Sequence, residues 1–264
     1  MDRSRARSLL AFFGLVFALS IPLWGMGHFA GHLSDLIPIA LPASSLMAFT
    51  PAAAALYLIW RQEGPAAARE LLRRSFDFRR IPNPGWIAAA ALFMPVTLFV
   101  TWLAMNVAGA PLPEPHLPLI ALPVFLAMFF AAALGEELGW QGFAFDRMHE
   151  RWNALTIALI LGAVWTIWHL IPYFQTGRGA AWIAWHCGVT MLLRIVTVWF
   201  YVNGRRSVFI AALFHTMSNV AFFLFPNYGS HYDPAWFVWI IGAAAGTIIA
   251  FYGPALTRTR PPVA

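Results

Sequence analysis

Long apolar runs alternate with short polar segments along this chain, and this alternation predicts its secondary structure. A helix needs about 20 mostly apolar residues to cross a bilayer, and eight runs in the sequence approach or exceed that length. Their expected ranges are 8–25, 36–60, 86–108, 117–145, 154–172, 180–202, 207–225 and 234–252. We therefore predict an all-α, polytopic membrane bundle of about eight transmembrane helices, built as a single domain over residues 1–264.

Composition supports a membrane location. Hydrophobic residues make up 60% of the chain and charged residues only 11%, whereas soluble domains carry about 25% charged residues. The single Cys187 excludes an internal disulfide framework. All 17 basic residues are arginine, and alanine is abundant, which is typical of a GC-rich bacterial genome. We expect the protein to lie in a bacterial inner membrane.

The arginines show how the chain is oriented. Of the 17, all except Arg178 and Arg194 fall in segments on one side of the predicted spans. The positive-inside rule makes that side cytoplasmic and predicts that both termini are cytoplasmic. The arginine-rich segment 61–80 predicts a solvated loop with a short interfacial helix that favours anionic lipid headgroups. The net charge of +6 therefore reflects membrane orientation, and no nucleic-acid partner is expected.

A few ionisable residues lie inside predicted spans, where such residues usually face the bundle interior and mark function. They are Glu136 and Glu137 in the fourth span, His169 in the fifth, His186 and Arg194 in the sixth, and His215 with Asn219 in the seventh. Glu137 and Gln141, Trp165 and His169, and His215 and Asn219 are each four residues apart, so each pair shares a helix face.

These residue types suit the activation of water. One glutamate can take a proton from water while an imidazole orients that water or supports a metal. A histidine beside an asparagine can donate hydrogen bonds to a developing oxyanion. A structural alternative stays open, in which the two glutamates pair with Arg194 and only lock the bundle.

The same residues resemble the motifs of the CPBP family of intramembrane proteases, which includes type II CAAX prenyl endopeptidases and bacteriocin-processing or self-immunity proteins. The family pattern is EExxxR, then FxxxH, then HxxxN. In this chain the three motifs correspond in order to Glu136–Gln141, Trp165–His169 and His215–Asn219. The resemblance covers about residues 117–225, which we expect to form the catalytic core of the bundle.

The resemblance implies a role for each matching position. Glu136 would activate water, His169 would orient it, and Glu137 would support them. His215 and Asn219 would stabilise the oxyanion. It leaves open whether a divalent metal such as zinc takes part, for which His169, His215 and Glu136 are the candidate ligands.

Two positions depart from the family pattern. Trp165 replaces phenylalanine, which keeps an aromatic side chain and its packing role. Gln141 replaces arginine, which removes the expected positive charge beside the glutamates. We hypothesise that Arg194 supplies that charge.

The sequence thus predicts an intramembrane endopeptidase, either a metalloenzyme or a glutamate-dependent one, acting on a membrane-associated peptide or protein. A bacterial host favours a leader peptide or a membrane-protein segment over a prenylated C-terminal tetrapeptide. One alternative is a non-catalytic immunity or peptide-binding protein of the same fold, which Gln141 favours. Another is a transporter with Glu136, His169 and Arg194 as a proton relay, although no inverted repeat supports it. The oligomeric state is left open.

Overall fold

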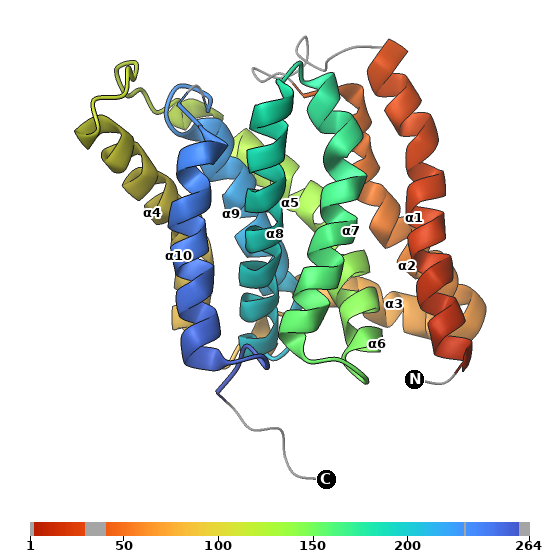
Figure 1. Ribbon diagram of the computed structural model, residues 1–264. Helices are drawn as coiled ribbons and strands as arrows, with labels where there is room; N and C mark the ends of the chain where they lie inside the picture. The colour runs from red at the N-terminus through yellow and green to blue at the C-terminus, as the bar shows by residue number, and fades with distance from the viewer. Residues whose placement is uncertain (1–2, 30–40, 230, 259–264) are drawn as a thin grey trace.

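The computed structural model describes residues 3–29, 41–229 and 231–258, which are helical throughout except for short connections (Figure 1). The α-helices are α1 (Arg3–Phe29), α2 (Thr50–Glu63), α3 (Pro65–Arg73), α4 (Pro84–Val107), α5 (Leu122–Gly139), α6 (Asp146–Met148), α7 (Ala154–Gln175), α8 (Ala180–Asn203), α9 (Val208–Leu224) and α10 (Pro234–Tyr252). The other helical segments are the 3₁₀ turns η1 (Ala43–Phe49), η2 (Arg74–Phe76), η3 (Phe78–Arg80) and η4 (Leu119–Ala121), and the π-helical η5 (Trp140–Phe145).

Seven helical stretches are long and apolar enough to cross a membrane, so the predicted polytopic all-α bundle is confirmed. They are Arg7–Phe29, Ala43–Glu63, Pro84–Val107, Leu119–Met148, Ala154–Gln175, Ala180–Asn203 and Pro234–Tyr252. The eighth predicted span, 207–225, forms α9, which has 17 residues. At 1.5 Å per residue α9 is about 25 Å long, short of a bilayer core of about 30 Å. Residues 36–40 of the predicted span 36–60 lie outside the described residues.

The helices begin where the sequence supplies caps. The Asn83 side chain accepts a hydrogen bond from Gly85 N at 2.7 Å at the start of α4, and Asn153 accepts one from Thr156 N at 2.9 Å at the start of α7. Ser207 caps α9 and is itself bonded to Asp77, at 2.6 Å between Oγ and Oδ1. These side chains satisfy amide groups that a helix leaves free at its first turn.

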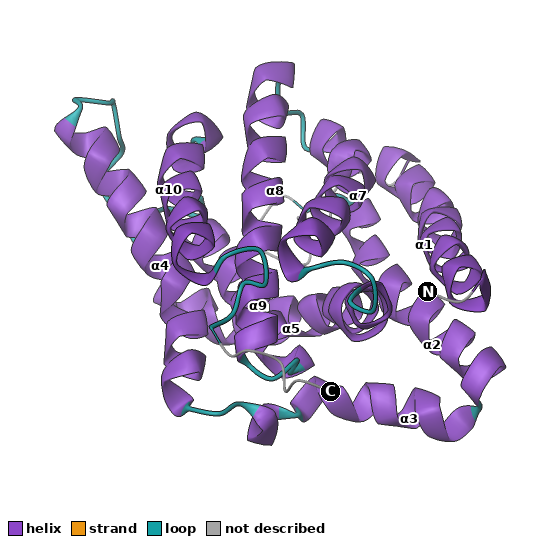
Figure 2. Cartoon of the chain, turned by 60° about the horizontal axis from the view of Figure 1, so that its bottom comes forward, coloured by secondary structure: helices purple, strands orange, loops and turns teal. Residues whose placement is uncertain are grey.

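One end of the bundle carries the arginines. There α3 runs across the ends of the long helices, and both α1 and α10 have their terminal ends on this side (Figures 1 and 2). We call this end the arginine face and define it by Arg61, Arg69, Arg73, Arg74, Arg79, Arg80, Arg147, Arg151, Arg205, Arg206 and Arg258. The segment 61–80 contains a short helix, α3, as the sequence predicted.

A partly buried polar cluster ties η2, which follows α3, to the rest of the bundle at the arginine face. Arg74 donates hydrogen bonds to Asp146 Oδ2 at 2.7 Å, to Gly142 O at 3.1 Å and to Arg206 O at 2.8 Å. Arg74 also bonds to the Tyr201 hydroxyl, which in turn donates to Asp146 Oδ1 at 2.9 Å. We call Arg74, Asp146 and Tyr201 the Arg74 cluster; it joins η2, α6 and α8.

Glycines let α5 approach its neighbours closely. A Cβ at Gly135 would lie 2.6 Å from the carbonyl oxygen of Ala48, and a Cβ at Gly139 would lie 2.5 Å from Pro51 Cβ. Larger residues at these positions would push α5 away from η1 and α2. The close approach holds the C-terminal turns of α5, which carry Glu136, at a fixed place in the bundle interior.

Candidate active site

Two neighbouring glutamates lie inside the bundle near the end of α5. Glu136 is 5% exposed, and Glu137 is completely buried. Consecutive side chains diverge by about 100° around a helix, and accordingly Glu136 contacts α7 whereas Glu137 contacts α8 and α9. The two carboxylates therefore have different partners.

Glu137 belongs to a buried ionic cluster of three residues. Arg194 Nη1 donates to both Glu137 carboxylate oxygens, at 3.0 and 2.9 Å, and His215 Nδ1 lies 2.9 Å from Oε1. The Arg194 guanidinium also lies over the Trp165 ring, 4.1 Å from its centroid. We call Glu137, Arg194 and His215 the Glu137 cluster. The positive charge hypothesised for Arg194 thus lies directly against Glu137.

Glu136 is held from α7 by an aromatic side chain. The Trp165 indole N–H donates to Glu136 Oε2 at 2.6 Å. Within the described part of the chain Glu136 makes no ion pair, so its second oxygen, Oε1, is the one left for other chemistry. The motif spacing predicted an aromatic packing residue at Trp165; the structure adds a hydrogen bond that phenylalanine could not make.

The two histidines of the motifs are each fixed through Nδ1. His169 Nδ1 lies 2.9 Å from the Trp165 carbonyl oxygen, which can only accept, so that nitrogen carries the proton and Nε2 is left as an acceptor. His215 Nδ1 donates to the Glu137 carboxylate in the same way. The His169 ring is further held between Trp168 and Tyr173, at centroid distances of 4.7 and 5.5 Å. Both imidazoles therefore keep Nε2 for chemistry.

The remaining motif residues, Asn219 and Gln141, lie in different surroundings. Asn219 follows His215 by one turn of α9 and lines the same cavity. Gln141 lies in η5 and is fully buried away from that cavity. Neither polar atom of its amide has a hydrogen-bond partner among the described residues. The motif residues that the structure brings together are therefore Glu136, Trp165, His169, His215 and Asn219 with the adjacent Glu137 cluster.

A cavity of about 400 Å³ joins these side chains. Its lining includes five of the sequence-predicted residues, namely Glu136, Trp165, His169, His215 and Asn219. The volume is in the range of small-molecule and peptide-side-chain pockets. The candidate site is thus a cavity with one carboxylate, two imidazoles and an amide in its wall.

A further set of polar side chains lines the same cavity and was not predicted as part of the site: Tyr173, His186, Thr190 and Tyr232. The Tyr173 hydroxyl lies 3.1 Å from Thr190 Oγ1, and His186 Nδ1 lies 2.9 Å from the Tyr232 hydroxyl. Tyr173 also packs against His186, at 4.8 Å between ring centroids. The sequence offered one signal, because Tyr173 follows His169 by four residues and Thr190 follows His186 by four. Tyr232 lies before α10 and had no such signal.

The candidate metal ligands do not form a metal site as they lie. The described residues contain no group of three or more His, Cys, Asp or Glu side chains placed to hold a metal ion. The Nδ1 atoms of His169 and His215 are used by a backbone carbonyl and by Glu137, and Glu136 Oε2 accepts from Trp165. These contacts leave His169 Nε2, His215 Nε2 and Glu136 Oε1 available to other ligands, and the described residues contain no assembled metal site.

Comparison with known proteins agrees with the motifs. Residues 118–221 match the family described as "Type II CAAX prenyl endopeptidase Rce1-like". A curated relative, "CAAX prenyl protease 2" of Methanococcus maripaludis, is 23% identical over 225 residues, which cover 79% of this chain and 82% of the relative. The match includes every motif residue, and together with the seven apolar spans it makes this an integral membrane protein.

Proposed function

Because residues 118–221 match the Rce1-like family of type II CAAX prenyl endopeptidases, we propose that this chain is an intramembrane protease that hydrolyses a peptide bond by a water molecule that Glu136 activates. The observation that carries this proposal is the difference between the two glutamates. Glu137 is neutralised by Arg194, whereas Glu136 reaches the cavity and has only a neutral hydrogen-bond donor, Trp165. A carboxylate that is not hydrogen-bonded to a cation keeps its basicity and can take a proton.

Charge balance supports a protonated His215. Arg194 and Glu137 cancel, which leaves the negative charge of Glu136, whose hydrogen-bond donor Trp165 packs against the His215 ring at 5.5 Å between centroids. An imidazolium at His215 makes the group of four neutral overall, which a buried site favours. His215 Nε2 then carries a proton and can donate a hydrogen bond to the substrate. The His169 imidazole is neutral, so its Nε2 can accept a hydrogen bond.

In the proposed reaction Glu136 acts twice, first as a base and then as an acid. Glu136 Oε1 takes a proton from water, which His169 Nε2 orients by accepting its other hydrogen, and the resulting hydroxide adds to the scissile carbonyl carbon. The carbonyl oxygen becomes an oxyanion that accepts hydrogen bonds from His215 Nε2 and Asn219 Nδ2. The C–N bond then breaks as Glu136 returns its proton to the leaving amine. Glu137 and Arg194 hold His215 in place.

We assign these steps to residues 117–225 as the catalytic core of a single membrane domain spanning residues 1–264. This core coincides closely with the family match over residues 118–221. The proposed substrate is a membrane-associated peptide or protein in a bacterial inner membrane. The prenylated substrate in the relative's name is the narrower possibility, and the all-arginine, alanine-rich chain favours a leader peptide or membrane-protein segment.

The experiment that tests this proposal is cleavage of membrane-tethered peptides by the purified protein in vesicles. Glu136→Gln is expected to lower kcat by about 10²- to 10⁴-fold, the usual effect of a general base, without changing the unfolding temperature appreciably. Glu70→Gln, on the exposed surface of α3, is the matched control and should leave cleavage unchanged. Cleavage by Glu136→Gln at the wild-type rate contradicts the proposal, and a chelator arm reports any metal requirement.

A non-catalytic binding protein is the second candidate, favoured by Gln141 at the family's arginine position. The ion pair between Arg194 and Glu137 weighs against this candidate, because Arg194 supplies from α8 the positive charge that Gln141 lacks. Peptide binding without cleavage, in wild type and Glu136→Gln alike, would support the binding protein instead.

A further inference from the structure

A surface pocket of about 450 Å³ lies on the arginine face, between the last turn of α3 and η3. Four arginines, two phenylalanines and two acids line it: Arg73, Arg74, Arg79, Arg80, Phe76, Phe78, Glu70 and Asp77. None of these described residues lines the cavity that contains Glu136, so the pocket is separate from the candidate active site.

The two acids of the pocket have partners of their own. Asp77 accepts hydrogen bonds from Ser207 Oγ at 2.6 Å and from the first two amides of α9 at 3.4 and 3.2 Å. These bonds occupy the start of α9, where a helix would otherwise attract an anion. Glu70 lies on the exposed surface of α3, 3.7 Å from Arg73. An anion that enters the pocket therefore has to bind to its arginines.

Two of the arginines are left for such an anion. Arg74 is already bonded to Asp146 at 2.7 Å. Arg80 lies 3.7 Å from Asp77, which is too far for a hydrogen bond. Arg79 makes no ion pair or hydrogen bond within the part of the chain that the structure describes. Arg79 and Arg80 are both exposed and adjacent, and guanidinium groups bind phosphate oxygens in pairs.

Phenylalanines continue from the pocket onto the outside of the bundle. Phe76 and Phe78 are 63% and 47% exposed. Phe76 packs against Phe130 of α5 at 6.2 Å between ring centroids, and Phe78 packs against Phe209 of α9 at 5.9 Å. Phe130 and Phe209 lie 5.8 Å apart, so the four rings are continuous. We call these four residues the phenylalanine surface; an exposed apolar surface beside arginines is typical of contact with lipid.

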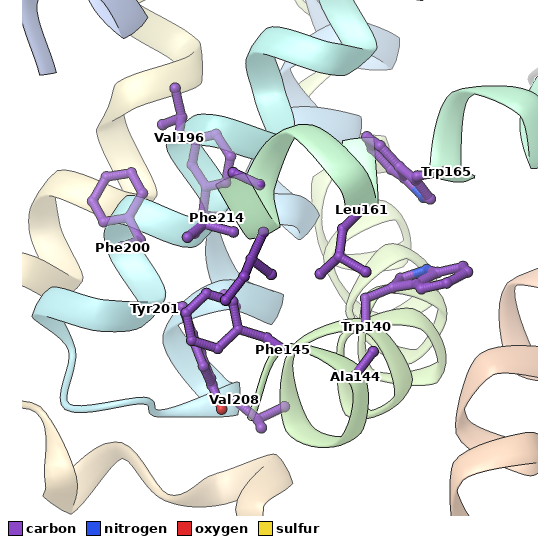
Figure 3. Packing of buried hydrophobic residues seen from close by; sticks show 14 of the residues in the cluster. Trp140, Ala144, Phe145, Leu161, Trp165, Val196, Phe200, Tyr201, Val208 and Phe214 are labelled. Atoms are coloured by element: carbon purple, nitrogen blue, oxygen red, sulfur yellow. The ribbon is translucent and has the colours of Figure 1, made fainter. Parts of the chain in front are cut away.

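The bundle interior next to the pocket is already filled. Phe145, Tyr201 and Val208 are fully buried and lie together with other core side chains (Figure 3). Phe145 and Tyr201 pack edge to face with 5.2 Å between their ring centroids, and Tyr201 bonds to Arg74 in the pocket wall. Packing of this density leaves no room for a hydrocarbon chain. The apolar part of a ligand must therefore lie outside, on the phenylalanine surface.

We propose that the pocket and the phenylalanine surface together bind one anionic phospholipid. Arg79 and Arg80 hold its phosphate, and the phenylalanine surface contacts its acyl chains. Two arginines carry more charge than one phosphodiester, so a headgroup with a net negative charge is favoured over a zwitterionic one, whose ammonium they would repel. A free phosphate would leave the phenylalanine surface uncovered. The general preference of segment 61–80 for anionic headgroups is thus assigned to two arginines and four phenylalanines, independently of the proposed function.

Lipid binding to the purified chain in neutral detergent tests the inference without catalysis. Native mass spectrometry measures the dissociation constants of dioleoyl phosphatidylglycerol and dioleoyl phosphatidylcholine. We expect phosphatidylglycerol to bind at least about 10-fold more tightly, the size of one hydrogen bond to a charged group. The double variant Arg79→Gln/Arg80→Gln should lose at least about 10-fold in affinity for phosphatidylglycerol. Its unfolding temperature without lipid should match that of wild type, because both side chains are exposed.

A matched control separates this pocket from the general charge of the arginine face. The double variant Arg61→Gln/Arg69→Gln removes the same charge from exposed positions outside the pocket. Because separated surface charges are screened, its affinity for phosphatidylglycerol should stay within about twofold of wild type. Equal affinity of the wild-type chain for the two lipids, or equal losses in the two double variants, overturns the inference.

A second pair of measurements distinguishes a lipid from a free phosphate. Phe76→Ser should weaken phosphatidylglycerol binding about 3- to 10-fold, because the acyl chains lose apolar contact. A large excess of inorganic phosphate, added at constant ionic strength, should leave the bound phosphatidylglycerol in place. Displacement of the lipid by inorganic phosphate, or unchanged affinity in Phe76→Ser, overturns the inference.

Discussion

The Glu137 cluster and the Arg74 cluster are both centred on an arginine paired with a carboxylate, fully buried in the first and partly buried in the second, yet they differ in what lies on the carboxylate's other side. Arg194 gives both of its hydrogen bonds to Glu137, whose remaining partner is His215 at the cavity wall. Arg74 divides its contacts among Asp146, Tyr201 and two backbone carbonyls from separate segments. The Glu137 cluster fixes the position of the His215 imidazole, whereas the Arg74 cluster links η2 to α6, α8 and the turn after α8.

The difference shows that burial of an ion pair does not by itself indicate function. A buried ion pair is often neutral for stability, but removal of one partner leaves an uncompensated charge. For the Glu137 cluster that charge would act on the reacting groups. For the Arg74 cluster it would act on the packing of η2 and α6. Substitutions in the two clusters should therefore separate activity from stability.

The largest expected effect comes from Arg194→Gln. Glu137 would lose its counter-charge and take the Nδ1 proton of His215, which leaves His215 a neutral and weaker donor and leaves the site one positive charge short beside the developing oxyanion. We expect cleavage to fall by at least about 100-fold, the size reported for loss of one oxyanion donor. Stability should fall by about 3–5 kcal/mol. Kinetics per folded molecule and thermal unfolding in the same detergent measure the two effects, and full activity in a destabilised protein would place Arg194 in a purely structural role.

A second substitution sharpens the role of Arg194. Gln141→Arg restores the family's arginine one turn after Glu137, so in the Arg194→Gln background it should recover at least about 10-fold of the lost activity. On its own, Gln141→Arg adds a second buried cation without a second anion and should lower stability by about 1–3 kcal/mol. If the double variant is no more active than Arg194→Gln, the two arginine positions are not equivalent.

Trp165→Phe tests the hydrogen bond to Glu136. The ring is retained and the indole donor is lost, and a hydrogen bond to a charged group is worth about 1.5–3 kcal/mol. We expect kcat/KM to change by about 10- to 100-fold, with a shift in its pH profile because Glu136 loses a donor. Trp168→Phe is the matched control, since its indole bonds Ser20 Oγ at 2.8 Å away from the glutamates. Equal effects in both variants would mean that packing alone is at work.

Arg74→Gln should have the smallest effect on catalysis. It removes contacts with Asp146 and the Gly142 and Arg206 carbonyls at the arginine face. We expect a loss of about 1–3 kcal/mol in stability, and activity per folded molecule within about twofold of wild type. A loss of activity as large as that of Arg194→Gln would instead show that the two clusters are coupled through α8.

Much of the fold follows from the sequence, because apolar length and arginine placement act locally. The run 207–225 is the exception: its length suggested a spanning helix, but α9 ends at Leu224 and is largely enclosed by other helices. Enclosure removes the need to match the bilayer thickness. A single sequence does not show which apolar helix is enclosed.

The sequence proposed the members of the candidate site but not the contacts between them. Spacing by four placed Trp165 with His169 and His215 with Asn219 on common helix faces. It could not show that the Trp165 indole bonds Glu136 or that Tyr232 meets His186, because those contacts join separate helices. The resemblance to a family supplied residue types, whereas the division of labour between Glu136 and Glu137 depends on how α5 is rotated in the bundle.

The helical segment that follows the glutamates limits where the chain can lose or gain a residue. The π-helical η5, Trp140–Phe145, follows the glutamates and precedes Asp146. A π turn holds more residues than an α turn, so η5 behaves as a one-residue insertion absorbed within a continuous helix. Deleting one residue from η5 would restore α-helical phase and swing all that follows by about 100°. Asp146 would then lose its contact with Arg74, while Glu136 would stay in place. The segment η5 therefore fixes the position of Glu136 relative to the Arg74 cluster at the arginine face.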